Sequence, residues 1–221
     1  MIETLETLAD VFYEGGWGMY PIAIVAMFVI AIGVERISYL CFKSRINKSN
    51  FVNTMHKYLY QGNLQRAITY CSSNPAPLSN IVKAGLLRVD GSEEEIKSAM
   101  ETVSLQELPR IEKRTGYLAM LSNAAVLLGL LGTISGLIKA FAAVSMVDTA
   151  DKATVLAQGI SEAMNCTAFG LGTAIPTLVL FSLLSGTTQH LIDDINESKT
   201  RMLNLLLENR DKLSVADIQG K

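Results

Sequence analysis

The segment from Gly129 to Leu184 consists of two long apolar runs joined by a short polar loop. Each run carries one threonine among small residues, Thr133 in the first and Thr167 in the second. Uncharged apolar runs of about 18 residues or more indicate membrane spans. The two runs therefore predict neighbouring transmembrane helices, and their threonines suggest that the helices line an ion path.

Composition supports a membrane protein with a third span near the N-terminus. The chain has 221 residues, of which 49% are hydrophobic, and these concentrate in three blocks separated by charged segments. The first block begins at Trp17, where an aromatic ring suits the membrane interface. The acidic residues before it lack the basic region of a cleaved signal peptide, so we expect this block to remain as an anchor.

Several function classes are disfavoured by charge and residue spacing. The net charge of −2 and the missing basic stripe argue against nucleic-acid binding. Cys41, Cys71 and Cys166 lie far apart, and His56 and His190 have no neighbour at ligand spacing, so we expect no metal and no cofactor. The spans carry no Ser-His pair, paired aspartates or HExxH motif, so we expect no catalytic residues and no enzyme.

The charged middle of the chain reads as a set of helices. Two prolines and several turn-forming residues predict a loop at 72–77. Ser92 followed by Glu95 is a capping-box signature for a helix start. We expect that helix to continue through Pro109, with or without a kink, into the second span.

The distribution of basic residues predicts the topology. Eleven lysines and arginines lie in residues 43–116 and five in 187–221, whereas 148–158 has one and 1–16 has none. By the positive-inside rule the N-terminus lies outside and the C-terminus inside. We predict an all-α membrane protein with three transmembrane helices, a helical cytoplasmic domain, and long helices extending from the second and third spans. The expected segments are an interfacial amphipathic helix (1–16), the first span (17–42), the cytoplasmic domain (43–116), the second span (117–147), a periplasmic loop (148–158), the third span (159–186), and a cytoplasmic helix and tail (187–221).

Small residues accompany each threonine on its helix. Gly132 and Gly136 form a small-xxx-small pair of the kind that lets helix backbones approach closely in lipid. Such a stripe with one hydroxyl suits either a pore lining or the packing of another helix, and a lone threonine often bonds back to its own helix. The glycines singled out are Gly129, Gly132 and Gly136 in the second span and Gly170 in the third.

Lys139 and Glu162 are charges within or near the spans, where charges are usually paired or functional. Each lies roughly 120–140° around its helix from the threonine. We expect them outside the pore lining and consider an ion pair between them, within or between subunits. Pro176 interrupts the hydrogen bonds of the third span and is either a hinge or merely tolerated.

A proton path needs a titratable group at membrane depth. No Asp, Glu or His lies mid-membrane on either threonine stripe. Either a partner helix supplies the carboxylate, or the chain moves no protons. Sodium is a second possible ion, since hydroxyl and carbonyl oxygens can bind it.

Two long motifs resemble the MotA/TolQ/ExbB proton channel family. They are Gly-Leu-Leu-Gly-Thr-Ile-Ser-Gly-Leu-Ile-Lys-Ala-Phe (129–141) and Gly-Ile-Ser-Glu-Ala-Met-Asn-Cys-Thr-Ala-Phe-Gly-Leu-Gly-Thr-Ala-Ile-Pro (159–176). Gly-Gly-Trp-Gly-Met-Tyr-Pro (15–21) also resembles the start of that family's first span. The three-span size resembles the TolQ and ExbB branch, and the wording of 136–141 resembles members that power gliding.

The resemblance implies a homopentamer in the bacterial inner membrane around two copies of an ExbD/TolR-like single-span partner that carries a membrane aspartate. Proton flow would drive rotation and work on a TonB/TolA-like or motility partner in the cell envelope. Thr133 and Thr167 match the family's pore threonines, and Glu162 and Pro176 match its glutamate and proline. A non-conducting membrane scaffold for an envelope complex is the alternative.

Overall fold

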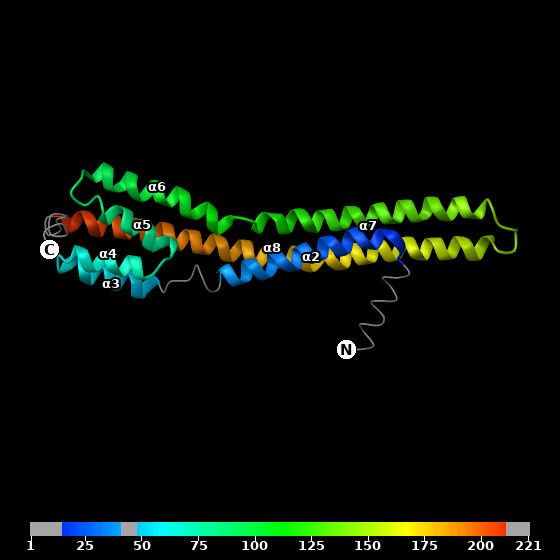
Figure 1. The fold of residues 1–221 in the computed structure, drawn as a ribbon, viewed down its shortest axis with the longest axis horizontal. Coiled ribbons are helices and arrows are strands. Elements are labelled where there is room, and N and C mark those ends of the chain that lie inside the picture. The colour runs from blue at the N-terminus through cyan, green and yellow to red at the C-terminus, as the bar shows by residue number, and fades with distance from the viewer. Residues whose placement is uncertain (1–14, 41–47, 211–221) are drawn as a thin grey trace. The chain divides into compact units, whose positions relative to one another are not determined.

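The computed structural model describes residues 15–40 and 48–210, and every regular element within them is a helix (Figure 1). In chain order these are η1 (Gly16–Gly18), α2 (Met19–Ser38), α3 (Lys48–Tyr60), α4 (Leu64–Ser73), α5 (Pro77–Leu86), α6 (Glu93–Glu112), α7 (Thr115–Val144) and α8 (Lys152–Glu208). The all-helical prediction is confirmed. The amphipathic helix predicted for 1–16 lies almost wholly outside the described residues.

Three stretches of the described chain are long and apolar enough to cross a membrane. They are Gly16–Ser38, Glu93–Val144 and Lys152–Glu208. The chain divides into two compact units, an apolar unit (Met1–Arg36 and Arg114–Leu184) and a polar unit (Ile37–Lys113 and Ser185–Lys221). Each of the three stretches contributes its apolar part to the apolar unit.

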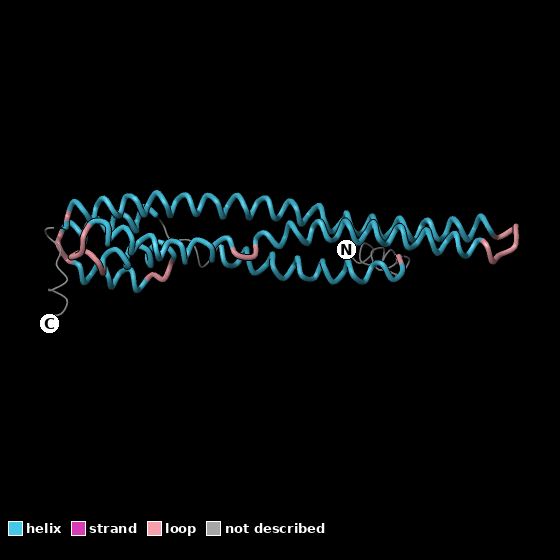
Figure 2. The backbone as a smooth tube through the Cα atoms, turned by 90° about the horizontal axis from the view of Figure 1, so that it is seen from above, coloured by secondary structure: helices cyan, strands magenta, loops and turns pink. Residues whose placement is uncertain are grey.

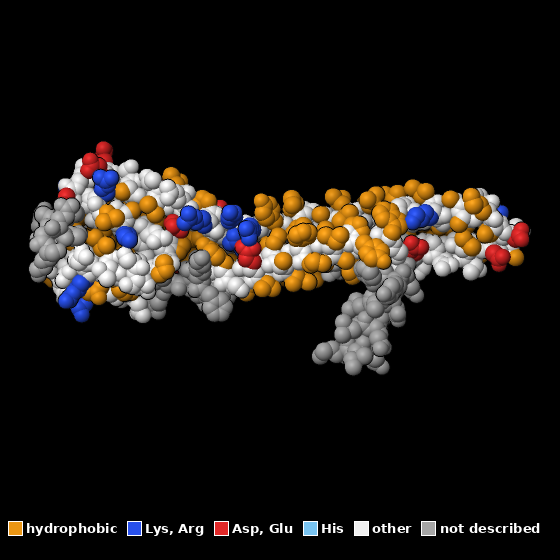
Figure 3. All heavy atoms as spheres, in the orientation of Figure 1, with side chains coloured by type: hydrophobic (Ala, Val, Ile, Leu, Met, Phe, Trp, Pro, Cys, Tyr) orange, Lys and Arg blue, Asp and Glu red, His pale blue; other side chains and the backbone are white. Residues whose placement is uncertain are grey.

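In the apolar unit, α2 and α7 run beside the N-terminal part of α8 (Figures 1 and 2). Large apolar side chains such as Phe28, Leu130 and Phe141 are more than half exposed. Hydrophobic side chains accordingly dominate the face of this unit that Figure 3 shows. Small residues between helices and large apolar ones outside are the arrangement that a lipid environment favours.

The backbones of α7 and α8 touch at glycines. A methyl group at Gly170 would lie 2.7 Å from the Ala125 carbonyl oxygen and 3.1 Å from the Gly129 α-carbon. This close approach also permits a polar contact between the helices, because the Ser122 hydroxyl donates to the Ala174 carbonyl over 2.9 Å. A buried hydrogen bond of this kind adds to the packing that holds membrane helices together.

The polar unit has a core of its own, built from α3 to α6 and the C-terminal part of α8. Met202 and Leu206 of α8 are fully buried, and Leu206 lies beside Gly85 of α5 together with Met100 of α6. The segment predicted as a separate tail (187–221) therefore shares this core in its described part. Burial also raises the pKa of the Cys71 thiol to about 12, which makes it an unreactive core residue.

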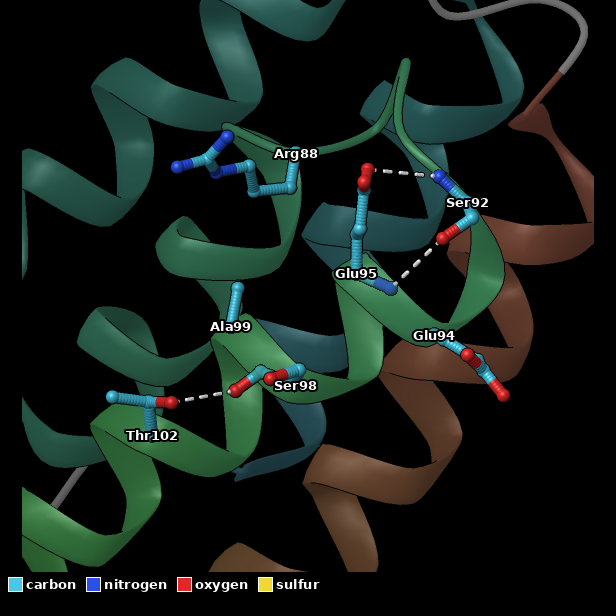
Figure 4. A pocket seen from close by; sticks show the side chains of 7 residues that line it. All are labelled: Arg88, Ser92, Glu94, Glu95, Ser98, Ala99 and Thr102. Carbon is cyan, nitrogen blue, oxygen red and sulfur yellow. Dashed lines mark hydrogen bonds between the residues drawn. The ribbon is translucent and has the colours of Figure 1, made fainter.

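The start of α6 confirms the predicted capping box. The Ser92 hydroxyl accepts from the Glu95 N–H at 3.2 Å, and the Glu95 carboxylate accepts from the Ser92 N–H at 3.1 Å (Figure 4). The loop predicted at 72–77 is shorter in the structure, because α4 continues to Ser73 and α5 begins at Pro77, which leaves only 74–76 between the helices.

The helix expected to run from Ser92 into the second span is interrupted. It passes through Pro109 but ends at Glu112, and α7 begins at Thr115. Arg114 adopts a left-handed conformation with φ 70°, which a helix interior does not allow. Its guanidinium pairs with Glu35 of α2 at 2.6 Å within the apolar unit.

The connection between the second and third spans is shorter than the predicted 148–158 loop. Helix α7 ends at Val144 and α8 begins at Lys152, so residues 152–158 are helical. Helix α8 then continues without a break in its helical structure to Glu208.

The glycine contact predicts a position-specific effect in α8. Gly170→Ala places a methyl group against the α7 backbone and should lower stability by about 1–3 kcal/mol. Gly172→Ala is the matched control, because nothing lies within 4 Å of its added methyl group. Thermal unfolding of both variants in detergent measures the difference, and equal unfolding temperatures would contradict the close approach.

The shared core of the polar unit predicts that a tail residue stabilises the helices α3 to α6. Leu206→Ala removes a fully buried side chain and should cost about 2–5 kcal/mol. Leu87→Ala, at a position that is 52% exposed, should change stability little. Guanidinium unfolding of the purified chain tests this, and an unaffected midpoint for Leu206→Ala would separate the tail from that core.

Candidate ion-path site

The structure brings Thr133 and Thr167 together between α7 and α8. Their hydroxyl groups are in hydrogen-bond contact with each other. Thr133 also contacts the carbonyl oxygen of Gly129 on its own helix at 3.0 Å, and Thr167 reaches the same carbonyl from α8 at 3.1 Å. We call these three oxygens the hydroxyl cluster.

The hydroxyl cluster has fewer protons than hydrogen-bond contacts. Each hydroxyl donates one proton and the carbonyl donates none, so two protons serve three contacts. At any moment one contact lacks a proton, and each hydroxyl chooses between two acceptors. The cluster can therefore reorder its hydrogen bonds without moving any heavy atom, and its spare lone pairs can accept from water or from a protonated partner.

The four predicted glycines are all buried and all lie where α7 meets α8. A methyl group at Gly132 would lie 2.7 Å from the Cys166 β-carbon, and one at Gly136 would lie 2.9 Å from that of Ala163. These contacts agree with the interpretation that the glycines let the two helices pack closely. By letting the helices approach, they bring Thr167 within reach of the Gly129 carbonyl.

Lys139 and Glu162 are not an ion pair in the described part of the protomer. The Lys139 ammonium lies over the Trp17 ring, 5.4 Å from its centroid. A carboxylate oxygen of Glu162 lies against Gly16, so closely that any side chain there would overlap it. A pair between subunits stays a prediction.

The turn before the first span contributes contacts that the spacing arguments missed. The Cys166 thiol donates to the Gly15 carbonyl at 2.9 Å, and Gly18 lies against both Cys166 and Gly132. The repeated glycines around Trp17 were the available signal, because glycine marks positions where a backbone must come close. Gly16, with φ +65°, also needs glycine for its conformation.

Pro176 is exposed and lies inside α8, whose helical structure continues through it. Nearby hydroxyls bond within the helix, with Thr173 donating to the Phe169 carbonyl and Thr177 to that of Thr173. Both roles predicted for the proline, a hinge and a tolerated break, remain predictions.

The chemistry of the site is that of neutral oxygens. The hydroxyl cluster contains no acid or base of its own. Within residues 15–40 and 48–210, no group of three or more His, Cys, Asp or Glu side chains is placed to hold a metal ion. The arrangement can relay hydrogen bonds, and proton transfer through it requires a titratable group from elsewhere.

Comparison with known proteins gives several relatives named for biopolymer transport. The chain is 28% identical over 195 residues to a putative biopolymer transport protein ExbB homolog of Methanothermobacter thermautotrophicus, covering 88% of this chain and 69% of that one. It is 31% identical over 167 residues to an ExbB-like protein of Synechocystis, covering 75% and 79%. It is 28% identical over 217 residues to ExbB of Salmonella typhimurium, covering 88% and 86%.

The fold also matches a solved structure. The structure of C. jejuni MotAB superposes with a TM-score of 0.60 at 18% identity, covering 90% of this chain and 77% of that one. Residues 73–197, which include both threonine motifs, match the MotA/TolQ/ExbB proton channel family. The predicted resemblance is therefore confirmed, as is the expectation of a transport protein and not an enzyme. The chain is a multi-pass membrane protein that belongs to the MotA/TolQ/ExbB proton channel family.

Proposed function

We propose that this protein is the ring-forming subunit of a motor driven by the proton-motive force in the bacterial inner membrane. Five copies surround two copies of a single-span partner of the ExbD/TolR type. Protons pass between the ring and the partner helices, and their passage turns one component against the other. Family membership and the similarity to proteins named ExbB support this function.

The observation that carries the proposal is the hydroxyl cluster. Two hydroxyls from neighbouring helices share one carbonyl, and the cluster can exchange hydrogen-bond partners in place. It has no group that gains or loses a proton near neutral pH. A partner carboxylate at the same depth supplies this missing step by exchanging protons with water, while the hydroxyl cluster solvates its neutral and charged forms.

Charge distribution supports the orientation within the membrane. Residues 43–116 hold 11 of the 19 lysines and arginines of the chain, whereas the turn between α7 and α8 has Asp148 and Asp151. With the basic region in the cytoplasm, the N-terminus and the α7–α8 turn face the periplasm.

The mechanical load lies in the cell envelope. Relatives named for biopolymer transport and for the Tol-Pal system support an effector of the TonB or TolA type, or a motility machine, as the recipient of the work.

A non-conducting scaffold is the second candidate. The bond from Thr133 to its own helix and the glycine packing favour it, because both features also occur in helix pairs that conduct nothing. Ion flux through the assembled complex distinguishes the two functions.

Removing a hydroxyl from the cluster should impair ion flux and leave assembly intact. Thr133→Ala or Thr167→Ala removes hydrogen bonds worth about 1–3 kcal/mol to a charge in transit, equivalent to roughly 5- to 150-fold in rate. Proton uptake by liposomes containing the ring and its partner measures the loss, and Thr→Ser variants should retain most of the flux.

Thr173→Ala provides the matched control. Thr173 lies on α8, and its hydroxyl donates to the Phe169 carbonyl of the same helix at 3.0 Å, outside the hydroxyl cluster. Its variant should conduct like the wild type. Normal flux from a Thr133→Ala/Thr167→Ala double variant would contradict the role of the cluster.

The composition of the complex is tested by intact mass determination after affinity purification of the tagged chain from native membranes. The proposal predicts about five copies with two copies of a small single-span protein whose membrane segment contains an aspartate. A stable ring with no such protein would favour the scaffold.

A further inference from the structure

The turn from Gly15 to Gly18, here called the entry turn, packs against α7 and α8. Its Gly15 carbonyl accepts a hydrogen bond from the Cys166 thiol of α8 at 2.9 Å. A methyl group at Gly18 would lie 3.0 Å from the Cys166 sulfur and 3.3 Å from the Gly132 α-carbon of α7. The entry turn thus touches both helices beside the residues that flank the hydroxyl cluster.

Two side chains of opposite charge also lie against the entry turn. Trp17 presents its ring to the Lys139 ammonium at 5.4 Å, a distance at which a cation is attracted to an aromatic face. The next residue back, Gly16, has the Glu162 carboxylate against it. Lys139 on α7 and Glu162 on α8 therefore both lie against this turn, and neither is within ion-pair distance of the other in the described protomer.

Lys139 has a clear consequence for cation movement. It follows Thr133 by six residues on α7, which is about 9 Å along the helix axis. An ammonium released to that distance from the hydroxyl cluster would lower cation occupancy by roughly 2- to 20-fold for effective dielectric constants between about 80 and 20. The lysine side chain is long, and the Trp17 ring that it contacts is half exposed. The position of the ammonium therefore depends on what holds it.

We propose that Trp17 is a positioning residue that keeps the Lys139 ammonium on the flank of α7, away from the hydroxyl cluster, and so lowers the electrostatic barrier to cations entering the site. This role rests on the proposed ion-conducting function. The entry turn supplies the rigid support, because its backbone is fixed by the Cys166 hydrogen bond and by contact with Gly132. Loss of the ring releases the lysine toward the path that leads to Thr133.

The contact itself is measurable without any ion flux. Trp17 is the only tryptophan in the sequence, so tryptophan fluorescence of the purified full-length complex reports on this ring, provided the partner contributes none or is subtracted as a separate sample. Lys139→Met should change the emission of Trp17, because the cation leaves its ring face. Lys152→Met, at the start of α8 and ten residues before Glu162, should not. Unchanged emission in Lys139→Met would overturn the proposal.

Rescue separates charge positioning from a structural role. Trp17→Leu should lower proton uptake by reconstituted liposomes by roughly 2- to 20-fold, the range of the electrostatic repulsion by the released ammonium. Adding Lys139→Met should restore the uptake, because no ammonium is left to misplace. Adding Lys152→Met should not restore it.

The outcomes distinguish this inference from the proposed function. Normal uptake by Trp17→Leu, or failure of Lys139→Met to rescue it, overturns the positioning role while the wild type still conducts. If Trp17→Leu does not assemble, Trp17→Phe serves instead, with a smaller loss expected and the same rescue required. No uptake by the wild-type complex would overturn the proposed function itself, and the positioning role with it.

Discussion

The close contact between the backbones of α7 and α8 is the feature on which the rest of the apolar unit depends. Lipid offers no hydrophobic force to drive two apolar helices together, so their association rests on packing and on polar contacts. Glycines at positions 129, 132, 136 and 170 remove the side chains that would hold the helices apart. Because the helices are close, a hydroxyl of α8 reaches a carbonyl of α7, and the entry turn packs against both helices.

The same constraint shapes the chemistry. A pair of helices separated by large side chains would leave each threonine bonded only to its own helix. Here the Gly129 carbonyl accepts from both Thr133 and Thr167, and the two hydroxyls also contact each other. Such a neutral cluster can solvate a proton carrier but cannot be one, since a threonine hydroxyl does not titrate in the physiological range. In the proposed function, the site is therefore half of a proton path.

Much of this architecture followed from the sequence because it depends on local rules. The three apolar stretches follow from hydrophobicity, the Ser92–Glu95 cap from short-range hydrogen bonding, and the neighbouring positions of the helices that carry Thr133 and Thr167 from two apolar runs joined by a short loop. The remaining features depend on contacts between distant residues. The helix is broken at Arg114, whose ion-pair partner Glu35 lies 79 positions away in the sequence.

The sequence likewise did not show which distant residues of the chain contact one another. Apolar residues such as Ile192, Ile195 and Leu206 recur at helical spacing in 187–221 and indicate a buried face, but they do not show what covers it. The structure places Leu206 beside Gly85. The opposite charges of Lys139 and Glu162 suggested an ion pair between them, but in the structure both side chains lie against the entry turn. A cation–π contact has no spacing rule, so only the fold could reveal that Trp17 and Lys139 meet.

In the proposed function, the hydroxyl cluster conducts protons only when a partner carboxylate completes it. The most direct test is proton uptake into sodium-free liposomes that contain either the ring alone, the ring with its wild-type partner, or the ring with a partner whose membrane aspartate is replaced by asparagine. We expect uptake with the wild-type partner and none above background in the other two. Equal uptake by the ring alone, or no uptake by the complete assembly, would contradict it.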